Sequence, residues 1–269
     1  MPHNLPSPLG GDAPDEAPLS RAPLERVVMQ VRFSSVLRIE QRDGIAVFQD
    51  QVRANYPLFE QITAQQLRID LAGGPPGVPQ VITTTAWQFE DAGRTLRLTL
   101  GAESATFEAL KYEGRSDFLA RWIEILARLQ AIYSPGLSVR TGARYINRFH
   151  GEALAQLTEL VKPNFVGVAQ PELREHVSHA LSEAALKVDE GHAMLRWGIL
   201  EAGSTIDPNL LEQISVPSWI LDIDVFAQEQ TAFDVARLAE TFEGLATRAY
   251  ALFRYAMNDS ALSYFGSAT

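Results

Sequence analysis

A row of three arginines in the middle of the chain is the feature whose residue types and spacing could do chemistry. Arg140, Arg144 and Arg148 recur at four-residue intervals within the segment SVRTGARYINRFH, residues 138–150. Because side chains alternate between the two faces of a strand, a strand here places all three on one face, with successive arginines roughly 13 Å apart. Guanidinium groups bind phosphate and carboxylate through paired hydrogen bonds. The spacing therefore predicts either an anion-binding site or a row that acidic residues on neighbouring strands neutralise.

Two further cationic side chains extend this candidate site. His150 follows on the same face of the predicted strand, and Arg32 lies on the polar face of an earlier strand. The candidate ligand-binding residues are Arg32, Arg140, Arg144, Arg148 and His150. The alternative is internal salt bridging, since Asp222 and Asp224 share one face of the segment WILDIDVF and Glu108 lies on a third predicted strand. Sheets pair opposite charges across strands and the chain has surplus acid, which favours this alternative while leaving the first open.

Other polar clusters and motifs point to no further site. His176 and His179 are three residues apart on a predicted helix, but a catalytic zinc site needs at least a third ligand, and no H-E-x-x-H motif occurs. Asp189, Glu190 and His192 gather just before a predicted strand, where loops collect such residues for solubility. The hydrolase motif G-x-S-x-G, the phosphate-binding loop and the dinucleotide motif G-x-G-x-x-G are missing from the sequence. We therefore predict no catalytic residue, no metal and no cofactor.

Composition places limits on the class of protein and its partners. The chain has 269 residues, 46% of them apolar and 21% charged, as in an ordinary globular protein. It contains no cysteine, which excludes disulfides and thiolate chemistry and fits a cytoplasmic protein. Its net charge of −10 argues against nucleic acid and anionic membranes as partners. No apolar run reaches the ~18 residues of a membrane helix, and the first residues do not have the pattern of a secretion signal.

Hydrophobic periodicity predicts the order of the elements along the chain. Residues 1–20 are rich in proline and glycine and are expected to form a disordered or loosely draped tail. Strands are predicted over 27–33, 81–90, 95–100, 105–112, 138–150, 193–201 and 219–226. Helices are predicted over 45–56, 116–133, 152–161, 171–181 and 233–257, and a loop over 71–79.

These elements predict an α+β fold. Consecutive hairpins favour an antiparallel sheet, and the two long amphipathic helices, 116–133 and 233–257, are expected to pack on one face of it. The β-rich first half, 21–150, and the second half, 151–269, are expected to form one compact unit. Each half leads from a hairpin into a long helix, which suggests a duplication, although no sequence identity supports a repeat.

Two segments resemble a known family. APLERVVMQVRF, residues 22–33, and GARYINRF, residues 142–149, resemble an uncharacterised bacterial family that is sporadically distributed across genomes. The end of the long C-terminal helix near Phe265 and Gly266 is similar too, so the resemblance spans roughly residues 23–266. It implies no established activity and no catalytic residues. Its patchy distribution is compatible with a role in defence or as the partner of a toxin.

Taken together, the residues favour a non-enzymatic cytoplasmic binding protein that assembles with another protein or with itself. The arginine-bearing sheet face is then the place for an acidic partner segment or a phosphate-bearing ligand. The alternative is an enzyme or sensor for a nucleotide-like anion, in which the arginines bind phosphate and His150 or His192 moves protons.

Overall fold

The computed structural model describes residues 8–17, 19–68 and 80–266. Within these residues, ten strands form one antiparallel sheet in the order β2-β3-β4-β5-β1-β6-β9-β8-β7, with β10 paired to β6. The strands are β1 (Leu24–Phe33), β2 (Leu58–Arg68), β3 (Gln80–Glu90), β4 (Leu96–Gly101), β5 (Ser104–Ala109), β6 (Leu137–His150), β7 (Ala180–Val188), β8 (Gly191–Leu200), β9 (Ser218–Ala227) and β10 (Thr231–Ala232).

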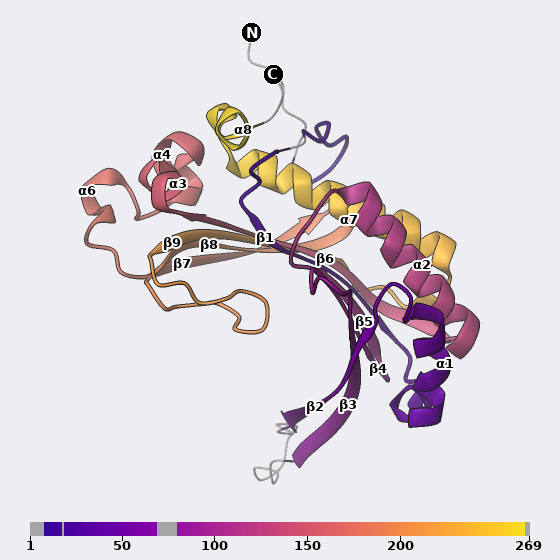
Figure 1. The fold of residues 1–269 in the computed structure, drawn as a ribbon. Coiled ribbons are helices and arrows are strands. Elements are labelled where there is room, and N and C mark those ends of the chain that lie inside the picture. The colour runs from indigo at the N-terminus through magenta and orange to yellow at the C-terminus, as the bar shows by residue number, and fades with distance from the viewer. Residues whose placement is uncertain (1–7, 18, 69–79, 267–269) are drawn as a thin grey trace, which may run out of the picture.

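The helices gather on one face of this sheet. They are the 3-10 turn η1 (Leu37–Glu40), α1 (Arg42–Val52), α2 (Arg115–Tyr133), α3 (Gly151–Ala155), α4 (Leu157–Leu160), α5 (Pro163–Val166), α6 (Pro171–Arg174), α7 (Val235–Ala256) and α8 (Asp259–Phe265). Figure 1 shows α1, α2 and α7 on the same side of the curved sheet, while the connection from β8 to β9 lies on the other side. The predicted α+β fold, with two long helices on one face of an antiparallel sheet, is confirmed.

The long helices form because their apolar residues recur at helical spacing. In α7, Leu238, Phe242, Leu245 and Leu252 are buried on one stripe, and the N-cap carboxylate of Asp234 accepts a hydrogen bond from a first-turn backbone N–H. The helix α2 packs against α7 and carries a similar stripe toward the sheet. Among the described residues, no helix is long and apolar enough to cross a membrane.

Two halves of the chain, β1 to α2 and β6 to α7, follow the same order of elements, so β6 opens the second half although residues 137–150 were predicted as the end of the first. A long strand, β1 or β6, leads through short helices to a run of antiparallel strands and then to a long helix, α2 or α7. The two long strands lie side by side and antiparallel at the middle of the sheet. The strands of both halves therefore belong to one sheet, and the recurrence suggested by the sequence is present as a repeat of topology.

The structure differs from the predicted elements in the less regular regions. The helix predicted over 171–181 is wrong: α6 ends at Arg174, and β7 begins at Ala180 and pairs with β8 along its whole length. The sheet edge overrides the helix propensity of the Ala-, Leu- and Glu-rich segment. The prediction also missed β2 and placed one helix over 152–161, where α3 and α4 are separate. The loop predicted over 71–79 lies outside the described residues.

Candidate functional site

The arginine row lies on β6, in the centre of the sheet and on the face opposite the long helices. This strand pairs with β1 on one side and with β9 on the other, so its side chains have neighbours on both sides. The predicted extended conformation of 138–150 is confirmed. Which groups neutralise the arginines then depends on the side chains of β1, β9 and the β8–β9 connection.

Arg144 is the most completely paired member of the row. Its Nε and Nη2 donate to the two carboxylate oxygens of Asp222, each at 2.8 Å, and its Nη1 donates to Asp207 at 3.2 Å. The Asp222 side chain is 3% exposed. Burial alone would lower the pKa of Arg144, but the hydrogen bonds and charges of Asp222 and Asp207 raise it above its ordinary value.

Arg140 also has an acidic partner. Its Nη2 donates to Asp224 Oδ2 at 3.0 Å, and its guanidinium carbon lies 4.6 Å from the centre of the Phe226 ring. The guanidinium group extends over Gly142, where an added Cβ would lie 2.7 Å from Arg140 Nη1. Burial raises the pKa of Asp224 above its ordinary value, and Arg140 and Arg144 offset part of that rise.

The other predicted site residues are not part of one cluster. Arg148 Nη2 donates to the backbone carbonyl of Glu212 at 2.7 Å, and its buried Nε has no hydrogen-bond partner among the described residues. Burial lowers the pKa of Arg148. Arg32 is exposed and forms no ion pair with another described residue. His150 is exposed at the end of β6, where it lines an open hollow of about 460 Å³ together with Arg148 and Arg21.

The helix-free face is therefore mainly an internal charge network. Arg26 on β1 continues it by pairing with Glu108 at 3.4 Å. The β8–β9 connection folds over the same face, where Leu211 joins a small apolar cluster around Ile146 and Ile220. The geometry of Arg140 and Arg144 matches the salt-bridge alternative, whereas anion binding by Arg32, Arg148 and His150 stays a prediction.

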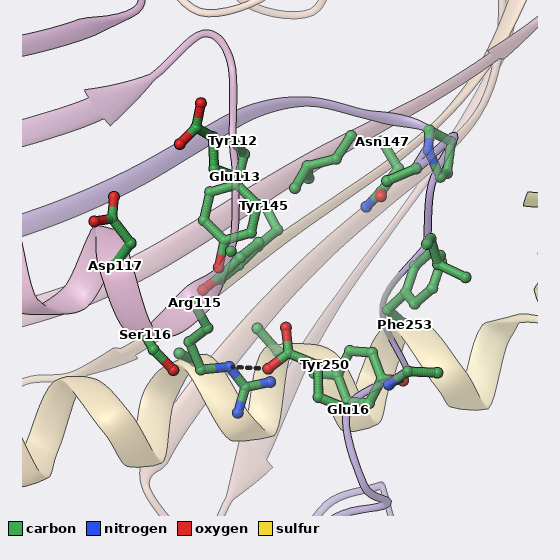
Figure 2. Close-up of a pocket in the computed structure, with 18 residues that line it drawn as sticks. Glu16, Tyr112, Glu113, Arg115, Ser116, Asp117, Tyr145, Asn147, Tyr250 and Phe253 are labelled. Carbon is green, nitrogen blue, oxygen red and sulfur yellow. Dashed lines mark hydrogen bonds and ion pairs between the residues drawn. The ribbon is translucent and has the colours of Figure 1, made fainter. Parts of the chain in front are cut away.

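A pocket on the opposite face was not predicted. It has a volume of about 550 Å³ and lies between β6, the first turn of α2, the second half of α7 and residues 16, 17, 19 and 22–24 (Figure 2). Most of its wall is apolar or aromatic: Ala17, Leu19, Ala22, Pro23, Leu24, Tyr112, Tyr145, Ala246, Ala249, Tyr250 and Phe253. The remaining lining residues are Gly114 and six polar residues: Glu113, Arg115, Ser116 and Asp117 where α2 begins, Glu16 on the N-terminal segment, and Asn147 on β6, away from the start of α2.

Arg115, the first residue of α2, supplies the positive charge of this pocket. Its Nη1 donates to Thr247 Oγ1 at 3.0 Å, and its Nε lies 3.3 Å from Glu16 Oε2. This Nε is buried and makes no hydrogen bond of good geometry with a described residue. Glu243 is 3.7 Å from Nη1. The arginine side chain is 12% exposed, whereas those of Glu16 and Glu243 are 43% and 54% exposed, so a buried cation faces two solvated acids.

Two tyrosines place polar groups in the same pocket. The hydroxyl groups of Tyr112 and Tyr145 point toward each other and toward Arg115 (Figure 2). The Tyr145 hydroxyl is buried, and its polar neighbour is the Tyr112 hydroxyl, which it approaches without the geometry of a good hydrogen bond. Burial raises the pKa of Tyr145 to about 12, and the nearby charge of Arg115 limits this rise. Burial and the proximity of Tyr145 also raise the pKa of Tyr112. Both phenols are therefore neutral near pH 7 and can act as hydrogen-bond donors.

The N-terminal segment closes one side of the pocket. Residues 8–17 and 19–20, part of the predicted tail, lie along α7 (Figure 1). The Gly11 N–H donates to Asp189 Oδ2 at 2.9 Å, and the Ala17 N–H donates to the Tyr250 hydroxyl at 2.8 Å. The Arg21 N–H then donates to the carbonyl of Phe265 at 3.0 Å. These bonds give the segment a defined path and bring Glu16 to Arg115.

The one signal for this pocket in the sequence is the alternation along residues 138–150, which puts Tyr145 and Asn147 on the face opposite the arginines; no site was predicted there. Arg115 directly precedes the helix predicted to begin at residue 116, and Glu16 lies in the predicted tail, so neither could be linked to that face. His176 and His179, predicted to share a helix, follow α6 instead, and no cluster of three potential metal ligands occurs among the described residues.

Comparison with known proteins gives no further indication of function. A scan of protein-family models, a search of curated proteins and a search of solved structures found no match to this chain, so the resemblance to a sporadically distributed bacterial family stays a prediction.

Proposed function

We propose that this protein is a non-enzymatic, cytoplasmic binding protein, and that the pocket between β6, α2, α7 and residues 16, 17, 19 and 22–24 holds a small ligand. The proposal keeps the predicted class of function but moves the site from the arginine row to the opposite face of the sheet. Arg140 and Arg144 have internal acidic partners, which leaves their guanidinium groups little capacity for a ligand.

The size and lining of the pocket support this function. A volume of about 550 Å³ lies within the range of small-molecule sites, which are mostly apolar with a few well-placed polar groups. Here the apolar part comes from α7 and from residues 17, 19 and 22–24, and the polar part comes from Arg115, Asn147 and the two tyrosine hydroxyls. Arg115, Tyr145, Asn147 and the α7 residues are on helices and strands of the core, so this part of the site is preformed, whereas Tyr112 and the N-terminal segment lie outside helices and strands.

The single observation that carries the proposal is the incomplete pairing of buried polar atoms at one end of this pocket. Arg115 Nε and the Tyr145 hydroxyl are both buried without a well-formed hydrogen bond to a described residue. Arg115 Nε is left with the 3.3 Å contact to Glu16, and the Tyr145 hydroxyl with the Tyr112 hydroxyl, so neither group is fully satisfied. A buried polar group without a full hydrogen bond costs up to about 1–3 kcal/mol. A ligand that hydrogen-bonds to both groups would remove this cost.

The test uses a neutral apolar dye, N-phenyl-1-naphthylamine, whose fluorescence rises in apolar surroundings. We expect saturable binding to the full chain with one site per molecule. Ala249→Phe places a ring in the pocket, because Ala249 lines it from α7, and should weaken dye binding at least about tenfold. The matched control is Ala236→Phe, at an exposed position of the same helix, which should leave binding unchanged.

Two results would overturn the proposed function. One is a lack of saturable dye binding by folded protein. The other is equal binding by the Ala249→Phe and Ala236→Phe variants, with circular dichroism confirming that both are folded. A filled pocket that still binds the dye would place the apolar site elsewhere on the molecule.

A further inference from the structure

We infer that the ligand of this pocket is an amphiphilic carboxylate, a single negative charge on an apolar body, and that its carboxylate takes the position now held by the carboxylate of Glu16 on Arg115. This inference rests on the proposed function of the pocket. The ligand is assigned to a chemical class, and the Glu16 carboxylate is its competitor within the chain.

The charge of the ligand follows from Arg115. Among the described residues that line the pocket, Arg115 is the one cationic side chain. Its guanidinium group is almost buried, but Glu16 Oε2 approaches Nε at 3.3 Å in poor hydrogen-bond geometry, and the Glu16 side chain is nearly half exposed. A ligand carboxylate inside the pocket could form the aligned, charge-assisted hydrogen bonds that Glu16 does not form. One arginine neutralises one negative charge, which disfavours a multiply charged phosphate ester.

The start of α2 adds to the attraction for an anion. Its N-cap residue is Gly114, which has no side chain to cap the first-turn N–H groups, and residues 114–117 line the pocket. The N-terminus of a long helix carries partial positive charge. Glu113 and Asp117, the acidic residues nearest this turn in sequence, point away from Arg115 in Figure 2, and Asp117 pairs with Arg121 at 2.7 Å.

The Tyr145 hydroxyl is the second polar group of the pocket that points to a ligand. It is buried in the pocket wall beside the Tyr112 hydroxyl, with which it makes only a poorly aligned contact, so it can still donate to a ligand. A neutral phenol donates a strong hydrogen bond to a carboxylate oxygen. Figure 2 shows the Arg115 side chain and the Tyr145 hydroxyl at the same end of the pocket, so one carboxylate placed there would face both groups.

The body of the ligand follows from the rest of the wall. Beyond the polar end, Ala246, Ala249 and Phe253 of α7 face Leu24 and the residues before it. These side chains offer no hydrogen bonds, so an apolar chain or ring gains free energy from burial there, whereas a sugar or a nucleoside would lose hydrogen bonds to water.

The same geometry gives residues 16–24 a role in regulation. Glu16 is held near Arg115 by the hydrogen bond from the Ala17 N–H to the Tyr250 hydroxyl. Its carboxylate and that of the ligand compete for one cation. Removing the charge of Glu16 should therefore strengthen binding of an anionic ligand and leave the binding of an uncharged one unchanged.

The experiment measures displacement of N-phenyl-1-naphthylamine from the full chain by decanoate and by decan-1-ol, which share an apolar chain and differ in charge. We expect decanoate to displace the dye at a concentration about tenfold lower than decan-1-ol. Arg115→Gln should remove this preference, whereas Arg128→Gln, on an outer face of the same helix, should keep it.

Glu16→Gln provides a second test that does not depend on the folding of the arginine variant. It should lower the half-maximal concentration for decanoate several-fold and leave that for decan-1-ol unchanged. The matched control is Asp15→Asn, at an exposed neighbouring position, which should change neither value.

The possible outcomes separate this inference from the proposed function. If the dye binds and decanoate and decan-1-ol displace it equally, the carboxylate inference fails and the binding pocket stands. An effect of Glu16→Gln no larger than that of Asp15→Asn would exclude Glu16 as a competitor. If the dye does not bind at all, both proposals fail.

Discussion

Asp222 shows how a single buried carboxylate organises the helix-free face of the sheet. It accepts two hydrogen bonds from Arg144 at 2.8 Å and lies 3.6 Å from Arg196 Nη1. The Asp222 side chain is almost fully buried. Its negative charge can be buried without a large cost because Arg144 and Arg196 both lie beside it. Asp207 also pairs with Arg144, but its side chain is 27% exposed and the contact is longer.

We predict that Asp222→Asn destabilises the protein by about 3–5 kcal/mol, because it leaves the buried Arg144 with one partly solvated partner. Urea unfolding measures this loss. The control is Glu183→Gln, which removes the exposed partner of Arg196 and should cost less than about 1 kcal/mol. Similar losses in the two variants would show that Asp222 does not hold the network together.

At the residue scale, the sequence could predict contacts within the sheet but not contacts made by connections. The alternation of side chains was enough to place Asp222 and Asp224 opposite the arginines. Glu108 was expected to reach the same row, but it pairs with Arg26 on β1 instead. Arg115 and Glu16 meet because the N-terminal segment packs on α7, and no local pattern in the sequence encodes that packing.

The turn between β3 and β4 illustrates how one side chain fixes the geometry of an element. The Asp91 carboxylate accepts hydrogen bonds from the N–H groups of Thr95 and Leu96, each at 2.6 Å, and from the Thr95 hydroxyl at 2.9 Å. Partial burial raises the pKa of Asp91, but these hydrogen bonds lower it more, so the net direction is downward. The turn between the strands predicted over 81–90 and 95–100 is therefore stabilised by a charged residue.

We predict that Asp91→Asn costs about 1–2 kcal/mol at pH 7, because it replaces charge-assisted hydrogen bonds with neutral ones. Since the folded pKa lies below the ordinary value of 3.8, this stabilisation is complete above that value and is lost as the pH falls through the folded pKa. Urea unfolding of both proteins from pH 7 to pH 3 should show the difference shrinking. Asp50→Asn, at an exposed position of α1, should show a difference near zero at every pH.

The pairing of β7 with β8 depends on a glycine. Gly198 has φ +143°, and an added Cβ would lie 1.9 Å from the backbone carbonyl oxygen of Ala180. Backbone atoms cannot move aside as a flexible side chain can. Gly101, in β4 of the same sheet, has only ordinary contacts for an added Cβ, the nearest at 3.8 Å.

We predict that Gly198→Ala costs at least about 2 kcal/mol and weakens the hydrogen bonds of β7, whereas Gly101→Ala changes stability by less than about 0.5 kcal/mol. Hydrogen exchange resolved by strand gives the second readout, since loss of protection should be confined to β7 and β8. Uniform loss across the sheet would contradict this local explanation.

At the element scale, length and periodicity decided what the sequence could predict. The helices α2 and α7 are long and strongly amphipathic, so both were predicted to within two residues at each end. The segment that forms β7 is exposed at most positions and rich in helix formers, and pairing at the sheet edge decides its structure. β2, also an edge strand, carries several polar residues and gave no clear alternation.

At the scale of the whole molecule, the two halves share one sheet. The boundary between them runs between β1 and β6, the pair of strands at the middle of the sheet. β1 belongs to the first half and pairs with β6 over most of its length, and both lie beneath the long helices. The core continues across this pair of strands, because α2 of the first half packs on α7 of the second. The ring centres of Trp122 and Phe242 lie 5.6 Å apart at this contact. Separating the halves would expose the apolar faces of both helices.

We therefore predict that the protein unfolds as one cooperative unit rather than as two domains divided between α2 and β6. Trp87 and Trp122 report on the first half and Trp197 and Trp219 on the second, so their fluorescence and circular dichroism should share one urea midpoint. Amide exchange should be slowest in β1 and β6, which open only on global unfolding, and faster in the edge strands β2 and β7. Two separate urea unfolding transitions would contradict this prediction. So would amide protection in β6 and β9 that outlasts the protection in β1 and β5. Either result would mean that the second half holds its own core without the first.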